Sequence, residues 1–339
     1  MSNPAPPLPA PHIVIAGAGS IGCFIGGLLA VAGHHVTLLA RPRIVADIQT
    51  HGLTLTDFSG LNQRVAPNQL SLTTTPDCLK TADLILVTVK TGATAEIARQ
   101  IAHHAPAQTP IISLQNGLHA CETLRAALPS RDIRAAMVPF NVVPQGQGAY
   151  HRATSGNIIL QSGPQNLATQ LTTPNLAISE TDDITATQWG KLLLNLGNAL
   201  NALSGQTLQQ QLLDRDWRHL IADQMAEALT VLKTAQIPIK STTPLPAWMG
   251  PHILRLPTPL FRKIAAQMLT IDPTARTSMA YDLMANRPTE IDSLQGAIIA
   301  LGQTHAIPTP ICTRVAHAIR TAEAAADGQP NLSPAGLRP

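Results

Sequence analysis

Apolar residues near the start of the chain form short runs separated by glycines. Residues 12–16 (HIVIA) are mostly β-branched and apolar, which is typical of a strand buried in a parallel sheet. A glycine-rich turn follows, and the apolar run 23–31 predicts a buried helix that ends at Gly33. Residues 36–39 (VTLL) then predict a second strand. The chain is therefore expected to begin with a strand–turn–helix–strand unit.

A membrane span is the alternative for this segment, because no charged residue occurs between Ile13 and Gly33 and about twenty apolar residues can cross a bilayer. Glycines interrupt the segment, however, and no lysine or arginine precedes it as in a signal peptide. We therefore favour a buried strand and helix and expect no membrane association.

The alternation of strands and helices continues through the first half. Residues 83–89 (DLILVTV) and 110–114 (PIISL) predict two further strands. Two more runs, 136–143 and 157–161, are expected to be closing strands, with the Pro/Gly/Gln-rich residues 144–148 as the loop between them. Such alternation predicts a mostly parallel sheet.

From about Ile184 the strand pattern stops and helical patterns replace it. We predict helices, separated by proline-rich stretches, at 187–203, 212–236, 260–269, 279–284 and 291–305. This change indicates an α/β domain over 12–183 and an all-helical domain over 184–326. The proline-rich residues 1–11 are expected to be a disordered tail and residues 327–339 a flexible one.

The composition argues against several classes of protein. The chain has 339 residues, of which 45% are hydrophobic, and this is too apolar for a disordered protein. The net charge of +3 comes without a basic stripe, so we expect no nucleic-acid partner. The four cysteines lie far apart, which argues against disulfides and a thiolate metal site and favours the cytoplasm. No metal is expected, because the chain contains no H-E-x-x-H motif or comparable ligand set.

Residues 17–22 (GAGSIG) match the G-x-G-x-x-G fingerprint of dinucleotide-binding folds. Gly17 permits a tight turn, Gly19 lets the backbone approach a pyrophosphate, and Gly22 lets the helix pack closely on the strand. The helix N-terminus then faces the anion. The turn also contains Ala18, Ser20 and Ile21. With the flanking strands and helix, the motif predicts an α/β fold with an N-terminal Rossmann-type doubly wound parallel sheet, followed by the all-α domain.

The residue that ends the second strand of such a unit separates NAD from NADP. An acidic residue there would bind the ribose hydroxyls, but this chain has Arg41 and no carboxylate until Asp47. A guanidinium can bind a 2′-phosphate through two parallel hydrogen bonds, so Arg41 predicts NADP. The competing interpretation is a solvated surface arginine.

Two polar residues follow later strands of the predicted sheet. Lys90 comes directly after one strand and Asn116 shortly after the next. Ligands of doubly wound sheets gather beyond the carboxyl ends of the strands, so we expect both residues near the coenzyme, and Asn116 also near a substrate. The alternative is that either is a plain turn residue.

In the helical half, Lys191, Asn195 and Asn198 are spaced i, i+4 and i+7 and share one face of a leucine-rich helix. Burying a lysine and two amides without partners is costly, so this face indicates the wall of a polar pocket. An exposed stripe on a surface helix is the alternative. Asn201 lies at the edge of the same face and is an alternative to Asn198.

A second group of polar residues lies within residues 278–292 and includes Ser278 and Glu290. Thr289 and Glu290 precede an apolar helix, where helix capping is the simpler role. Periodicity does not decide whether Ser278 or Glu290 faces Lys191.

Together these motifs resemble those of the ketopantoate reductase (2-dehydropantoate 2-reductase) family. The matching strings, in the family's order, are GAGSIG (17–22), VTVK (87–90), QNG (115–117), KLLLN (191–195) and SMAYDLMANRPTEID (278–292). The resemblance covers nearly the whole chain and implies a Rossmann domain and a helical domain, with NADPH and substrate in the cleft between them. One departure is Ala199, where the family usually has another asparagine followed by proline.

The resemblance also implies roles for single residues. Lys191 matches the general acid. Asn195 and Ser278 match substrate-binding positions, while Lys90, Asn116 and Glu290 match residues that bind the coenzyme or border the substrate. In the reaction, Glu290 would hold Lys191 in place or accept a substrate hydroxyl.

The implied reaction is the NADPH-dependent reduction of 2-dehydropantoate to pantoate by hydride transfer, in pantothenate and coenzyme A synthesis. One alternative is reduction of a different 2-oxo acid on the same fold, and another is a nicotinamide-sensing protein without turnover. A homodimer formed through the helical half is left open.

Overall fold

The computed structural model describes residues 11–242, 245–269 and 272–338 and contains two compact units. Unit 1 consists of the described residues up to 116 together with 120–182. Unit 2 consists of residues 117–119 and the described residues from 183 onward. The tail expected at residues 1–11 lies outside the described residues, apart from Pro11.

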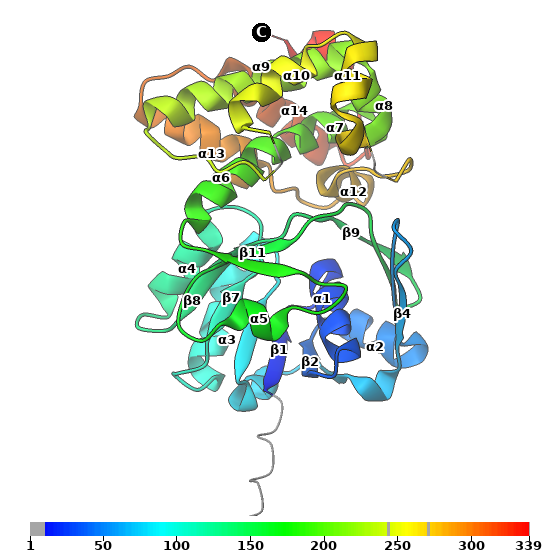
Figure 1. The fold of residues 1–339 in the computed structure, drawn as a ribbon, viewed down its shortest axis with the longest axis vertical. Helices are drawn as coiled ribbons and strands as arrows, with labels where there is room; N and C mark the ends of the chain where they lie inside the picture. Colours follow the sequence, from blue (N-terminus) through cyan, green and yellow to red (C-terminus); the bar gives the residue numbers. More distant parts are fainter. Residues whose placement is uncertain (1–10, 243–244, 270–271, 339) are drawn as a thin grey trace, which may run out of the picture. The chain divides into compact units, whose positions relative to one another are not determined.

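Unit 1 is built around a large, mainly parallel sheet (Figure 1). Its described strands are β1 (His12–Ala16), β2 (His35–Leu39), β5 (Ser71–Thr73), β6 (Leu84–Val87), β7 (Ile111–Ser113), β8 (Ile133–Met137), β11 (Ile158–Gln161) and β12 (Ile178–Thr181). Their order is β12-β11-β8-β7-β6-β1-β2-β5, and the strands from β8 to β5 are parallel. The predicted α/β class is thereby confirmed. Because β1 lies between β2 and β6, it marks the point where the chain reverses its direction along the sheet, and ligands of such sheets bind at this point.

Helices pack on this sheet through apolar faces. The described helices of this part of the chain are α1 (Ser20–Val31), α2 (Pro42–His51), α3 (Thr94–His104), α4 (His119–Ala127) and α5 (Leu167–Leu171), with short 3-10 helices η1 (Pro67–Gln69), η2 (Pro76–Thr81) and η3 (Thr91–Ala93). All five residues of β1 are buried, as the apolar run predicts. Helix α1 is buried along most of its length, because it contacts β1 and β2 as well as a second, smaller sheet.

The smaller sheet of unit 1 is absent from the sequence-based prediction. Its described strands are β3 (Leu53–Asp57), β4 (Asn62–Val65), β9 (Val142–Gly146) and β10 (Ala149–Arg152), in the order β4-β3-β10-β9. The prediction of a loop over 144–148 is therefore wrong for residues 144–146, which form the end of β9. Pro144 obscured this strand, but β9 is an edge strand, where a missing amide hydrogen is tolerated.

A buried ion pair joins the two central strands of the smaller sheet. Arg152 on β10 pairs with Asp57 on β3, whose side chain is 2% exposed. The guanidinium also lies over two aromatic rings, with its Cζ 5.5 Å from the Phe24 centroid and 5.6 Å from the Phe140 centroid. Burial raises the pKa of Asp57, but the hydrogen bond from Arg152 and those from Ser59 and Leu61 outweigh burial and lower the pKa to about 2.

Removing one partner of this pair is expected to destabilise unit 1. Arg152→Met should lower the free energy of unfolding by about 3–5 kcal/mol, because it leaves a buried carboxylate without its counter-ion. The control Arg64→Met removes an exposed arginine of β4 and should change the stability by less than about 0.5 kcal/mol. Urea unfolding followed by circular dichroism measures both, and equal stability of the two variants would contradict the prediction.

The Arg152–Asp57 pair also predicts that the free energy of unfolding depends on pH. Because the folded pKa of Asp57, about 2, lies below its ordinary value of 3.8, its stabilising contribution is complete above pH 3.8. The contribution is lost as the pH falls from 3.8 through about 2. In Arg152→Met this component of acid destabilisation should be smaller.

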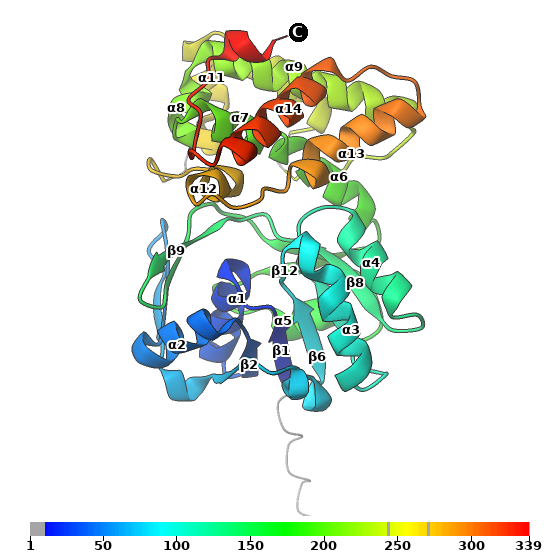
Figure 2. The ribbon, with the colours of Figure 1, turned by 180° about the vertical axis from the view of Figure 1, so that it is seen from behind.

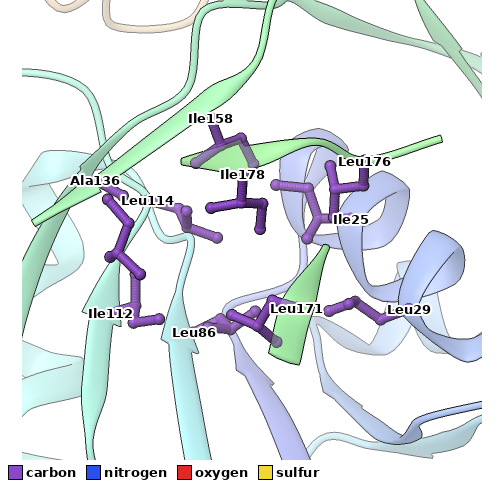
Figure 3. Close-up of a pocket in the computed structure, with 11 residues that line it drawn as sticks. Ile25, Leu29, Leu86, Ile112, Leu114, Ala136, Ile158, Leu171, Leu176 and Ile178 are labelled. Atoms are coloured by element: carbon purple, nitrogen blue, oxygen red, sulfur yellow. The ribbon is translucent and has the colours of Figure 1, made fainter. Parts of the chain in front are cut away.

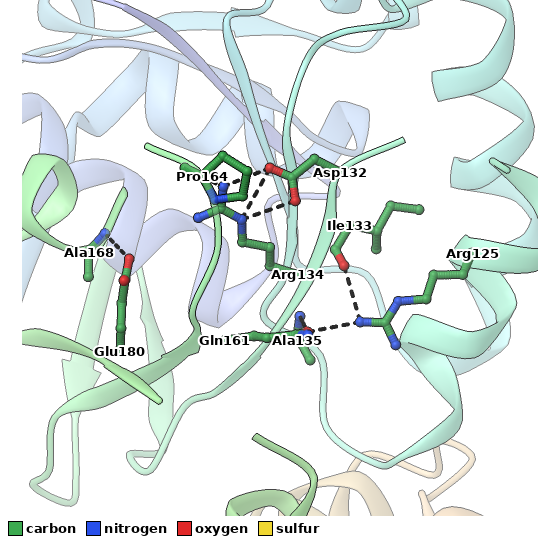
Figure 4. A network of polar contacts seen from close by, with 9 residues as sticks. All are labelled: Arg125, Asp132, Ile133, Arg134, Ala135, Gln161, Pro164, Ala168 and Glu180. Carbon is green, nitrogen blue, oxygen red and sulfur yellow. Dashed lines mark hydrogen bonds and ion pairs between the residues drawn. The ribbon is translucent and has the colours of Figure 1, made fainter. Parts of the chain in front are cut away.

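Strand β8 is parallel to β7 but antiparallel to β11, and side-chain hydrogen bonds reinforce the β8–β11 pair (Figure 4). Gln161, the last residue of β11, accepts a hydrogen bond from the Ala135 amide at 3.2 Å and another from Arg125 Nη2 at 2.9 Å. Arg125 also donates to the Ile133 carbonyl at 3.1 Å, so helix α4 is tied to both strands. These bonds stabilise the antiparallel pair that joins β11 and β12 to the rest of the sheet.

The interior of unit 1 contains a small apolar cavity (Figure 3). Its lining comes from α1, α5 and the sheet strands and is entirely hydrocarbon, including Ile25, Leu86, Ile158 and Leu171. The space is about 10 Å³, which is room for at most one water, and it offers no polar partner to hold one. It is a packing feature of the core, without room for a substrate.

Unit 2 is helical, as predicted. Its described helices are α6 (Ile184–Asn195), α7 (Gly197–Ser204), α8 (Leu208–Leu213), α9 (Arg215–Thr234), α10 (Gly250–Leu254), α11 (Thr258–Ile264), α12 (Ser278–Met284), α13 (Ile291–Thr304) and α14 (Pro310–Ala325), with 3-10 helices η4 (Ala247–Met249), η5 (Ala266–Leu269) and η6 (Pro334–Leu337). None of the helices in the described part of the chain is long and apolar enough to cross a membrane.

Several helices of unit 2 differ from their sequence-based prediction (Figure 2). The segment expected as one helix over 187–203 divides at Leu196 into α6 and α7. The segment expected as one helix over 212–236 divides at Asp214, whose side chain accepts hydrogen bonds from the Asp216 and Trp217 amides and so begins α9. Helix α14 was not predicted. Its buried residues include the small Cys312 and Ala316, so the sequence shows little difference in hydrophobicity between its buried and exposed faces.

The C-terminal residues from 327 to 338, for which a flexible tail is expected, make contacts within unit 2. The Leu332 amide donates to the Leu203 carbonyl at 2.8 Å, and Gln329 donates to the Ala202 carbonyl at 3.0 Å. Leu337, in η6, is 1% exposed and belongs to the helical core.

Candidate functional site

The glycine turn after β1 has the geometry that its sequence predicts. Gly17 has φ +85°, and a Cβ there would lie 2.0 Å from Cγ1 of Val89. The amides of Gly17 and Ala18 both donate to the Leu39 carbonyl, at 3.0 and 2.9 Å. Thr88 Oγ1 donates to the Gly17 carbonyl at 3.0 Å. The turn is therefore held against the ends of β2 and β6.

The space around the other two glycines differs in a way that suits a bound pyrophosphate. A Cβ on Gly22 would lie 2.4 Å from Thr88 Oγ1, so this glycine permits close packing of α1. A Cβ on Gly19 would meet no described atom within 4 Å. Helix α1 begins at Ser20 without a side-chain cap or an acidic residue in its first turn, so its first amides and its dipole favour an anion.

Arg41 directly follows Ala40 at the end of β2 and is exposed. Its backbone caps α2, where its carbonyl accepts hydrogen bonds from the Ile44 and Val45 amides. The first carboxylate after it, Asp47, accepts a hydrogen bond from the Gly148 amide at 2.9 Å and lies 3.2 Å from His51 Nδ1. This placement suits recognition of an anion by Arg41.

The loops after β6 and β7 are joined by a residue that the sequence analysis does not single out. Buried Gln115 donates through Nε2 to the Val89 carbonyl at 3.1 Å and to Thr94 Oγ1 at 2.7 Å. Lys90 follows Val89 and is exposed, and Asn116 follows Gln115 and is half-buried. Gln115 therefore joins the two loops that carry the predicted residues, at the carboxyl edge of the sheet, on which the glycine turn also lies.

In unit 2, α6 begins with a capped turn and carries the predicted lysine. Asp183 accepts a hydrogen bond from the Ala186 amide at 3.0 Å, which sets the start of the helix. Lys191 is half-buried two turns later, and Glu290 occupies the N-cap position of α13. Burial lowers the pKa of Lys191 to about 8, and the opposite charge of Glu290 resists this decrease. The structure thus brings Lys191 and Glu290 within electrostatic range of each other.

The predicted amides lie on either side of a helix interruption. Asn195 is the last residue of α6, Leu196 separates the helices, and Asn198 lies in the first turn of α7. Both asparagines are half-buried, as is Ser278, the first residue of α12. Thr277 Oγ1 donates to the Asn198 carbonyl at 3.1 Å and so joins the start of α12 to α7.

The structure distinguishes between Asn198 and Asn201. Asn201 is completely buried, and its Nδ2 donates to the Gln206 carbonyl at 3.1 Å and to Gln211 Oε1 at 3.3 Å. Its Oδ1 accepts a hydrogen bond from the Thr277 amide at 3.1 Å. Because both ends of the Asn201 amide have internal partners, its role is structural, and Asn198 is the better candidate for contact with a ligand.

Two family models match consecutive parts of this chain. Residues 13–165 match "Ketopantoate reductase PanE/ApbA", and residues 183–323 match "Ketopantoate reductase PanE/ApbA C terminal". A 2-dehydropantoate 2-reductase from Halobacterium salinarum is 23% identical over 321 residues, which cover 92% of this chain and 99% of the relative.

Solved structures show the same fold. A PanE/ApbA family ketopantoate reductase from Ralstonia eutropha JMP134 superposes with a TM-score of 0.78 and 27% identity, over 93% of this chain and 99% of that one. A D-mandelate dehydrogenase solved with NADH and anilino(oxo)acetate gives a TM-score of 0.77 and 21% identity over the same shares of the two chains, a likeness of fold.

Proposed function

Because this chain belongs to the ketopantoate reductase family, we propose that it reduces 2-dehydropantoate to pantoate with NADPH, a step of pantothenate and coenzyme A synthesis. The observation that supports this activity best is the Lys191–Glu290 pair. An ammonium group whose pKa is about 8 is charged at neutral pH, yet gives up its proton readily. Lys191 lies on α6, the helix that also carries the side-chain amide of Asn195.

The proposed mechanism uses Lys191 as the general acid. NADPH, when bound, supplies a hydride from C4 of its nicotinamide to the ketone carbon of the substrate. As the C=O bond breaks, negative charge grows on the oxygen, and the Lys191 ammonium stabilises this charge and then donates a proton to it. Glu290 keeps the amine charged before the reaction, while Asn195, Asn198 and Ser278 hold the substrate carboxylate and hydroxyl.

The proposed coenzyme site is the glycine turn of unit 1. Residues 17–22 present free space at Gly19 and an uncapped helix N-terminus, which fit a pyrophosphate. Lys90 and Asn116 are proposed to contact the coenzyme beyond β6 and β7. We assign the preference for NADPH over NADH to Arg41, which binds the 2′-phosphate.

Arg41→Asp tests this preference. The ratio of kcat/KM with NADPH to kcat/KM with NADH should fall by about tenfold to hundredfold, because hydrogen bonds to a charged group contribute about 1.5–3 kcal/mol. Arg43→Asp makes the same charge change at an exposed position two residues later and should alter the ratio much less. An unchanged ratio in Arg41→Asp would mean that another residue recognises the phosphate.

A panel of 2-oxo acids, assayed by the absorbance of NADPH and NADH, tests the substrate. We expect 2-dehydropantoate to give the highest kcat/KM. The likeness in fold to a D-mandelate dehydrogenase makes an aromatic 2-oxo acid the principal competitor. A higher kcat/KM for that compound would reassign the substrate, and no turnover with any 2-oxo acid would favour a nicotinamide-sensing role.

A further inference from the structure

A buried amide side chain contacts the backbone at the interruption between α6 and α7. Gln295 on α13 is completely buried, and its Nε2 donates to the Leu196 carbonyl at 2.9 Å. Leu196 is the single residue between the two helices, and its φ of −56° and ψ of −31° are helical. Sharp changes in a helix have identifiable local causes, and Gln295 donates its hydrogen bond to the carbonyl of the residue at this interruption.

This amide is only partly satisfied. Gln295 Oε1 has no hydrogen-bond partner among the described residues, although the side chain is completely buried. An apolar residue of similar size would avoid this desolvation penalty, so stability alone does not account for a glutamine at this position. Among the described residues, the one hydrogen bond that its side chain makes is to the Leu196 carbonyl.

The position of that bond matters because of what lies on either side of it. Lys191 and Asn195 precede Leu196, and Asn198 follows it. In a helix, each residue adds about 100° of rotation, so the three side chains share a face only while the helix keeps its turn through Leu196. A change of one residue in the hydrogen-bond pattern would rotate Asn198 away from Lys191.

We propose that Gln295 is a positioning residue, which holds the α6–α7 junction so that Asn198 stays on the face of Lys191 and Asn195. This inference rests on the proposed function, because it assigns these three side chains to one substrate. It predicts an effect on the binding of the 2-oxo acid. It predicts none on the coenzyme, whose proposed residues belong to unit 1, or on the protonation of Lys191, which lies in α6 before the junction.

Gln295→Met is the first test. It replaces the amide with an apolar side chain of similar length and removes the bond to Leu196. We expect KM for the 2-oxo acid to rise and kcat/KM to fall by about 10- to 100-fold, the scale associated with a displacement of about 1 Å. KM for NADPH and the apparent pKa of the rate should match the wild type.

The chain offers a matched control in Gln224, on α9. Helices α9 and α13 contact each other, and Gln224, like Gln295, is completely buried. Neither Nε2 nor Oε1 of Gln224 has a partner in the described part of the chain. Gln224→Met therefore removes a buried amide without removing a hydrogen bond, and it should leave the kinetic constants unchanged and the stability equal or higher.

Gln295→Glu covers the case in which Gln295→Met folds poorly. Burial raises the pKa of a carboxyl group, and the neutral acid can donate to the Leu196 carbonyl as the amide does. At about pH 6 this variant should keep a KM near the wild-type value. A rise in KM equal to that of Gln295→Met would contradict a role for the donated hydrogen bond.

Hydrogen exchange makes this test independent of the substrate. In Gln295→Met the backbone amides of residues 195–201 should exchange faster than in wild type or in Gln224→Met, because the hydrogen bond from Gln295 to the Leu196 carbonyl is lost. Unchanged exchange together with unchanged KM would overturn the proposal. If wild type reduces no 2-oxo acid, the proposed function fails, while the exchange result still decides whether Gln295 holds the junction.

Discussion

Lys191→Met is expected to lower kcat for reduction of the 2-oxo acid by about 10²–10⁴-fold, the usual contribution of a general acid. Methionine keeps the length and the apolar stem of the half-buried side chain, so packing on α6 should persist. The affinity for NADPH should be unchanged, because the proposed coenzyme residues belong to unit 1. Stopped-flow or steady-state measurement of NADPH oxidation gives kcat, and fluorescence titration gives the affinity.

Lys233→Met is the matched control, since it removes an exposed ammonium from the last turn of α9. It should leave kcat at the wild-type value. Equal turnover by Lys191→Met and wild type would remove Lys191 from the mechanism.

The pH dependence of the reaction should report the same group. Lys191 must be protonated to act as an acid, and its pKa is about 8 because burial lowers it more than Glu290 raises it. The rate of reduction should therefore be level below about pH 8 and fall about tenfold per pH unit above it. Glu290→Gln removes the carboxylate that favours the ammonium, so the break should move to lower pH. A break that stays in place would show that Glu290 does not act on Lys191.

Gly19→Val is expected to abolish tight coenzyme binding without unfolding the protein. Gly19 has a negative φ of −96°, outside the left-handed region that favours glycine, and a Cβ there meets no described atom within 4 Å. The new side chain would occupy the space proposed for the pyrophosphate. We expect the Kd for NADPH to rise at least about hundredfold, equivalent to about 2.7 kcal/mol.

Two other glycines serve as references for this variant. Gly336→Val adds the same side chain in open space near the C-terminus and should change neither stability nor affinity. Gly22→Val should lower the stability, because its Cβ would lie 2.4 Å from Thr88 Oγ1 and 2.8 Å from Ile15 Cγ2. Wild-type affinity in Gly19→Val would place the pyrophosphate elsewhere.

The parts of the fold that were predictable are those in which local pattern and burial agree. Strand β1 is mostly apolar and buried throughout, and the glycine motif after it is informative because a strand precedes it and a helix and a second strand follow. The smaller sheet was missed because its edge strands, such as β4 (NQRV), are largely polar and exposed. Its strands come from distant parts of the chain, and no local pattern records that Asp57 pairs with Arg152.

The candidate site also has features that the sequence predicts and features that it does not. The spacing of Lys191, Asn195 and Asn198 predicts a shared face, but it contains no information about which residue approaches that face from another helix. The position of α13 selects Glu290 as the charge acting on Lys191. The internal hydrogen bonds of Asn201 make Asn198 the amide that we propose for contact with a ligand.

By itself, then, the sequence determined the class of the fold, the glycine turn after β1 and the identity of the polar residues on α6, since each depends on neighbours within a few positions along the chain. Only the tertiary structure decided the second sheet, the partner of Lys191 and the contact of Gln295 with Leu196. These depend on packing between segments tens of residues apart, where burial and charge act through space.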